Sequence, residues 1–108
     1  MVTLKLDWDD ITFKTAARRM ARIYEAHGVI PDLYKTQHGY HCYAQLTERL
    51  NPDNLFALRV LYQDDPMRIW LDKQRIEDGT DYDVLFQDDE WKVPIEKVAK
   101  ELNRVSFV

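Results

Sequence analysis

The hydrophobic period changes within the first 28 residues, and this change constrains the fold more than any other feature of the chain. Over Val2–Trp8 apolar side chains occupy every second position, which is the pattern of a half-buried strand. From there to about His27 they recur at helical spacing, and Gly28 then supplies a helix stop signal. We expect Asp9 or Asp10 to cap this helix. A strand leading directly into an amphipathic helix predicts a domain that combines both types of element.

Five further segments are predicted as regular elements. They are, in chain order, strands over 32–36 and 40–46, a helix after Asn51, a strand over 82–86 and a helix after Pro94. The first two of these strands flank a turn at His38-Gly39, so we expect them to form a hairpin. The segment 66–75 fits either a helix or a strand.

This element order contains the βαββαβ order of a ferredoxin-like, or RRM-like, α+β sandwich. Such a domain has an antiparallel four-stranded sheet with its helices on one face, and its first and third strands lie side by side in the centre. The length of 108 residues suits one such domain, covering the whole chain. The other face of the sheet would be uncovered and available for binding.

Composition excludes several classes of protein. No apolar run approaches the roughly 20 residues of a membrane helix, and the acidic N-terminal stretch does not resemble a signal peptide. The single cysteine, Cys42, lies in an apolar run, so we expect a buried thiol in a reducing, cytoplasmic environment. A net charge of -4 argues against a protein that coats nucleic acid by bulk electrostatics, although local contacts remain open.

Two carboxylates stand one residue apart at the end of the first predicted strand. Side chains at positions i and i+2 of a strand point the same way, so Asp7 and Asp9 could hold a hard divalent cation between them. His41, on the neighbouring third strand, would face the same surface. The ordinary alternative is that Asp7, Asp9 and Asp10 form a strand end and a helix cap, with His41 as a half-exposed strand residue.

Three short motifs in this sequence resemble those of the archaeo-eukaryotic primase superfamily. Residues Leu4–Asp9 are similar to its first motif, a hydrophobic run followed by Asp, a hydrophobic residue and Asp. Residues Thr36–Tyr43 are similar to its second motif, in which a small hydroxyl residue precedes a glycine, an aromatic residue and a histidine. Residues Arg68–Asp72 are similar to the third, a hydrophobic run that ends in a further Asp.

The resemblance implies an RRM-like catalytic core for metal-dependent nucleotidyl transfer in DNA replication. Asp7 and Asp9 would hold Mg²⁺ or Mn²⁺, with Asp72 as a third catalytic carboxylate. His41 would contact the phosphates of an incoming nucleotide. Thr36 and Tyr43 would complete the nucleotide-binding set. An inactive relative, or a subunit that needs a larger replication partner, is equally compatible with these motifs.

A different class of function fits the same predicted sheet. In a non-catalytic RRM-like module, Tyr43 would stack on the bases of single-stranded nucleic acid, or the sheet would bind another protein. Lys14, Arg18 and Arg22 recur at intervals of four residues and predict a basic stripe on the first helix. This stripe could contact nucleic acid, although such a stripe is more often a solvated helix face.

Overall fold

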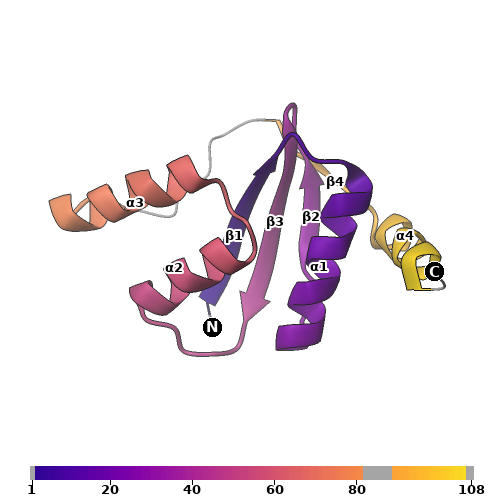
Figure 1. The fold of residues 1–108 in the computed structure, drawn as a ribbon, viewed down its shortest axis with the longest axis horizontal. Helices are drawn as coiled ribbons and strands as arrows, with labels where there is room; N and C mark the ends of the chain where they lie inside the picture. The colour runs from indigo at the N-terminus through magenta and orange to yellow at the C-terminus, as the bar shows by residue number, and fades with distance from the viewer. Residues whose placement is uncertain (1, 82–88, 107–108) are drawn as a thin grey trace.

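The computed structural model describes residues 2–81 and 89–106, which form an α+β protein (Figure 1). Its elements, in chain order, are β1 (Val2–Asp9), α1 (Phe13–His27), β2 (Asp32–Lys35), β3 (Gly39–Leu46), α2 (Pro52–Leu61), α3 (Pro66–Asp78), β4 (Trp91–Lys92) and α4 (Ile95–Ser106). The undecided segment 66–75 is therefore helical and belongs to α3. No helix of the described residues is long and apolar enough to cross a membrane.

The four strands form one antiparallel sheet in the order β1-β3-β2-β4. The predicted neighbours β1 and β3 do pair, from Val2 opposite Leu46 to Asp9 opposite Gly39. In a ferredoxin-like sheet the last strand would also lie beside β1, whereas β4 pairs with β2 here. The strand expected over 82–86 lies outside the described residues. The α+β class and the antiparallel sheet are thus confirmed, and the ferredoxin-like topology is not.

Side chains take the position that a neighbouring strand would occupy along part of β1. The backbone N–H of Asp7 donates to Asp64 Oδ1 at 2.8 Å, and the carbonyl of Lys5 accepts from Arg68 Nη1 at 2.9 Å. The outward-facing backbone groups of such a strand need partners, and here Asp64, between α2 and α3, and Arg68, in the first turn of α3, supply them. The start of α3 is thereby held against the middle of β1.

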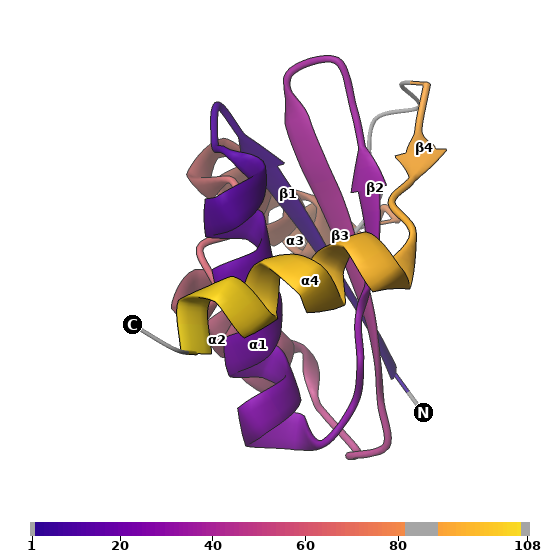
Figure 2. The same ribbon diagram turned by 90° about the vertical axis from the view of Figure 1, so that its right-hand side faces the viewer.

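The core lies between the sheet and the helices (Figure 2). It contains the inward-facing residues of β1 and β3 and the apolar stripe of α1, among them Leu4, Leu6, Trp8, Cys42, Ala44, Ala16, Ala17, Met20 and Ile23. Cys42 is fully buried, as expected, and burial raises the pKa of its thiol. Trp8 also donates from Nε1 to the carbonyl of Tyr62 at 2.9 Å, which ties β1 to the end of α2.

Helix α1 ends where the sequence predicts, but it begins at a different cap. Gly28 closes it in the left-handed conformation with φ of 69°. At the other end the hydroxyl of Thr12 accepts from the backbone N–H of Thr15, so the prediction that Asp9 or Asp10 caps this helix was wrong. Asp10 instead adopts φ of 57° and donates its N–H to the carbonyl of His38. The carboxylate of Asp9 is therefore not used as a helix cap.

Candidate metal centre on the sheet face

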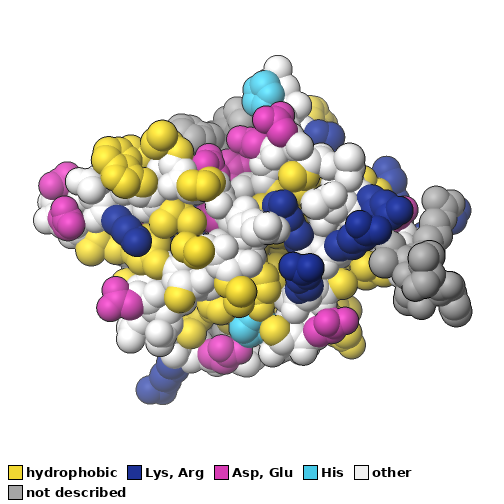
Figure 3. Space-filling view, in the orientation of Figure 1, with side chains coloured by type: hydrophobic (Ala, Val, Ile, Leu, Met, Phe, Trp, Pro, Cys, Tyr) yellow, Lys and Arg dark blue, Asp and Glu magenta, His cyan; other side chains and the backbone are white. Residues whose placement is uncertain are grey.

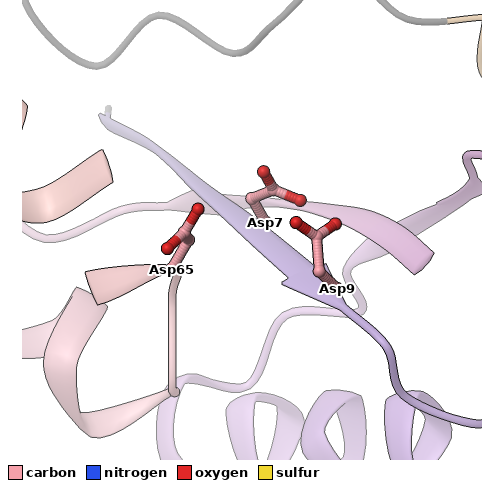
Figure 4. A group of neighbouring side chains, drawn as sticks. All are labelled: Asp7, Asp9 and Asp65. Carbon is pink, nitrogen blue, oxygen red and sulfur yellow. The ribbon is translucent and has the colours of Figure 1, made fainter. Parts of the chain in front are cut away.

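Three carboxylates converge beside the end of β1 (Figure 4). Asp7 and Asp9 project from the same side of the strand, and Asp65 reaches them from the start of α3. Each offers an oxygen, and these three oxygens lie within 4.8 Å of one another. Asp7 is buried, Asp65 is partly exposed and Asp9 is exposed, so the cluster is accessible to solvent at the Asp9 end.

Asp64 explains why the three carboxylates meet. Its Oδ1 accepts from the backbone N–H of Asp7 at 2.8 Å and from that of Asp65 at 2.9 Å. Its Oδ2 accepts from Arg59 Nε at 2.7 Å and from Arg68 Nη1 at 2.6 Å. A fully paired buried carboxylate thus fixes the backbones of two members of the cluster relative to each other. Asp64 has a structural role, and Asp65 is left to face β1.

Asp72, the third carboxylate implied by the primase resemblance, lies elsewhere. It is fully buried on α3, where its oxygens are 2.8 Å from Arg59 Nη2 and 2.8 Å from Arg75 Nη1. The structure therefore brings Asp65, not Asp72, to Asp7 and Asp9. The sequence offered one signal for this position, because Asp65 precedes Pro66 as a typical helix cap, and its Oδ1 indeed accepts from the N–H of Met67.

The electrostatics of Asp7 favour a bound cation. Burial raises the pKa of its carboxyl from 3.8 to about 6, and the nearby carboxylate of Asp9 adds to the increase, while His41 opposes it. Asp7 Oδ1 has no hydrogen-bond partner among the described residues, and the nearest basic group is His41 Nε2 at 3.5 Å. Three carboxylates, one of them with a buried oxygen that receives no hydrogen bond from the described residues, supply the hard oxygen donors that divalent cations such as Mg²⁺ and Mn²⁺ prefer.

His41 lies beside this cluster, but both of its ring nitrogens face carboxylates. Nε2 is directed at Asp7, and Nδ1 is 2.5 Å from Oε1 of Glu90. The phenol of Tyr43 donates to the same Glu90 oxygen at 2.5 Å. Burial opposes the ionisation of Glu90, yet the hydrogen bonds from His41 and Tyr43 outweigh it and lower the pKa of this carboxyl. A phosphate could reach Nδ1 of the imidazole only by displacing Glu90.

Glu90 was not predicted, because it is 49 residues from His41 in sequence and no local pattern marks it. The sheet face opposite α1 was expected to be uncovered, whereas His41 on that face contacts Glu90 and is only 2% exposed. Asp7, Asp9, His41 and Tyr43 do share this face, as predicted, because their positions alternate with the core residues of β1 and β3.

The remaining predicted site residues lie away from the cluster or serve the fold. Thr36 is buried in the β2–β3 turn, where its hydroxyl accepts from the N–H of Gly39 at 3.1 Å. Lys14, Arg18 and Arg22 are exposed on α1, and Lys and Arg side chains gather over this helix in Figure 3. Because α1 packs on the core face of the sheet, this basic stripe and the carboxylate cluster lie on opposite sides of the sheet.

Comparisons of this chain with protein-family models, with curated proteins and with solved structures found no match.

Proposed function

We propose that this chain is a primase-like domain in which Asp7, Asp9 and Asp65 hold a divalent cation, Mg²⁺ or Mn²⁺, that binds the phosphates of a nucleotide. The observation that carries the proposal is the buried Oδ1 of Asp7, which receives no hydrogen bond from the described residues and lies inside a group of three carboxylates. Folding has placed like charges together and left one oxygen unsatisfied, which is unfavourable unless a cation completes the site.

The reaction class that this arrangement would serve is nucleotidyl transfer to nucleic acid, alone or with a larger replication partner. A bound divalent cation neutralises charge on phosphate oxygens and orients them. The chain itself would contribute positioning: Asp64 holds the backbones of Asp7 and Asp65, and His41 holds the carboxylate of Asp7 from the side. Release of Glu90 would make the imidazole and the Tyr43 phenol available to a phosphate.

The test is a calorimetric titration of chelator-treated protein with Mn²⁺, followed by inorganic tripolyphosphate. We expect Mn²⁺ to bind, tripolyphosphate to bind only after Mn²⁺, and Asp9→Asn or Asp65→Asn to weaken Mn²⁺ binding by at least about tenfold. Asp10→Asn is the matched control, since Asp10 is an exposed neighbouring carboxylate outside the cluster. Absent Mn²⁺ binding, or equal binding by the cluster variants and the control, would refute the proposal.

One observation favours a second candidate, a non-catalytic module that binds single-stranded nucleic acid. The rings of Tyr34 and Tyr43 lie 5.3 Å apart on this sheet face, where they could stack on bases. This function predicts oligonucleotide binding that persists in a chelator and is weakened by Tyr43→Ala. Loss of oligonucleotide binding when the metal is removed would exclude it.

A further inference from the structure

A hollow lies on the same sheet face as the carboxylate cluster. It is a pocket of about 280 Å³ lined by Thr3, Asp32, Tyr34, Tyr43, Gln45 and Glu90. We infer that this pocket takes the base of the nucleotide whose phosphates the carboxylate cluster binds. The inference rests on the proposed function and adds to it the position and the orientation of the nucleotide.

The strand register places the pocket within reach of the cluster. Asp7 stands opposite His41, whereas Thr3 stands opposite Gln45, four residues back along β1. At about 3.3 Å per residue, the far wall of the pocket is therefore roughly 13 Å from Asp7. Tyr43 lies between these two rows of the sheet. A nucleotide can bridge such a separation, because its sugar and phosphate linkages stand between the base and the terminal phosphate.

The walls of the pocket suit a flat heterocycle. The rings of Tyr34 and Tyr43 are nearly perpendicular, with an interplanar angle of 89°, and form an aromatic corner in which a base can stack. Polar groups stand around this corner. Thr3 donates from its hydroxyl to Oε1 of Gln45 at 3.0 Å, and the carboxylate of Asp32 lies 3.6 Å from Nζ of Lys92. Hydroxyl, amide and carboxylate groups can pair with the hydrogen-bonding edge of a base.

The charges in the pocket set the direction in which a nucleotide would lie. The charged residues that line the pocket, Asp32 and Glu90, are both acidic, so even with Lys92 beside Asp32 the lining disfavours phosphate groups and suits the amino groups of an uncharged base. The cluster of Asp7, Asp9 and Asp65, once it holds a cation, attracts phosphate instead. The two regions are connected, since Glu90 lines the pocket and also contacts His41. The phosphates would thus lie beside Asp7 and the base beside Tyr34.

The experiment compares two nucleoside triphosphates with inorganic tripolyphosphate, which lacks the nucleoside. Calorimetry in Mn²⁺ measures the affinity of ATP, of CTP and of inorganic tripolyphosphate for the wild-type protein, for Tyr34→Leu and for Gln45→Ala. We expect at least one nucleotide to bind about tenfold more tightly than tripolyphosphate, because of base stacking. Both variants should reduce this excess and leave the affinity for tripolyphosphate unchanged. Tyr24→Leu, at an exposed tyrosine of α1, is the control and should keep the excess.

The outcomes separate the two proposals. If tripolyphosphate and both nucleotides bind with equal affinity, the base pocket is refuted and the metal centre is not. The same conclusion follows if a nucleotide binds more tightly than tripolyphosphate and neither substitution reduces that difference. Failure of tripolyphosphate to bind in the presence of Mn²⁺ overturns the proposed function and the pocket together. Should Tyr34→Leu fail to fold, as judged by circular dichroism, Gln45→Ala decides alone, because the side chain of Gln45 is exposed and does not belong to the hydrophobic core.

Discussion

Substitution of Asp7 by asparagine should stabilise the metal-free protein while it removes the central ligand of the metal centre. Asp7 is only 6% exposed, and burial together with the carboxylate of Asp9 raises the pKa of its carboxyl from 3.8 to about 6. A group that is harder to ionise in the folded state than in the unfolded chain opposes folding when it is charged. With about 1.4 kcal/mol for each pKa unit, the ionised carboxylate reduces the free energy of unfolding by about 3 kcal/mol at neutral pH.

The pH dependence identifies the cause. Because the folded protein binds this proton more tightly than the unfolded chain, the destabilisation is complete above pH 6. It decreases as the pH falls from about 6 towards the ordinary value of 3.8, where both states become protonated. Asparagine has nearly the same shape and no charge, so Asp7→Asn should gain stability at neutral pH and gain little at about pH 4.

Urea unfolding in the presence of a chelator measures this difference. The expected gain for Asp7→Asn is about 3 kcal/mol at neutral pH and under about 1 kcal/mol at pH 4. Asp10→Asn, which removes a carboxylate that is exposed, should change the stability little at either pH. The reasoning is refuted if Asp7→Asn is less stable than the wild-type protein at neutral pH, or if its gain is the same at both pH values.

Two further predictions concern the anion site and the hairpin. Glu90→Gln removes the charge that the imidazole and the phenol now contact, so it should strengthen tripolyphosphate binding in Mn²⁺ by about tenfold, or about 1.4 kcal/mol by calorimetry. Asp89→Asn is the control, because it removes one negative charge from an exposed neighbouring position. If the two substitutions strengthened tripolyphosphate binding equally, the specific role of Glu90 would be contradicted. Gly39→Ala should lower the free energy of unfolding in urea by more than about 2 kcal/mol, because its Cβ would lie 2.0 Å from a backbone carbonyl oxygen of β1. Gly28→Ala is the comparison: a Cβ at Gly28 meets no other atom, and only the φ of 69° opposes it, so the free energy of unfolding should fall by about 1 kcal/mol. A smaller loss of stability for Gly39→Ala than for Gly28→Ala would contradict the close contact between Gly39 and β1.

Local patterns were sufficient for the elements whose signals are contained in a few neighbouring residues. The alternation over Val2–Trp8 predicted β1, and the helical spacing with Gly28 predicted α1 and its end. The spacing of Asp7 and Asp9 placed them on one side of the strand without any tertiary information. The cap was wrong because Asp10 is bound by the distant carbonyl of His38, a contact that no local pattern records.

The sequence by itself therefore determined a strand–helix beginning, the pairing of two carboxylates and the position of His41 on the same face. Only the tertiary structure decided that Asp65 completes the cluster, that Asp72 pairs with arginines, and that Glu90 contacts the imidazole. The physical reason is that these contacts join residues brought together by packing. Their partners depend on how the start of α3 docks on β1 and on where Glu90 meets β3, and the period of a single strand or helix contains no information about either.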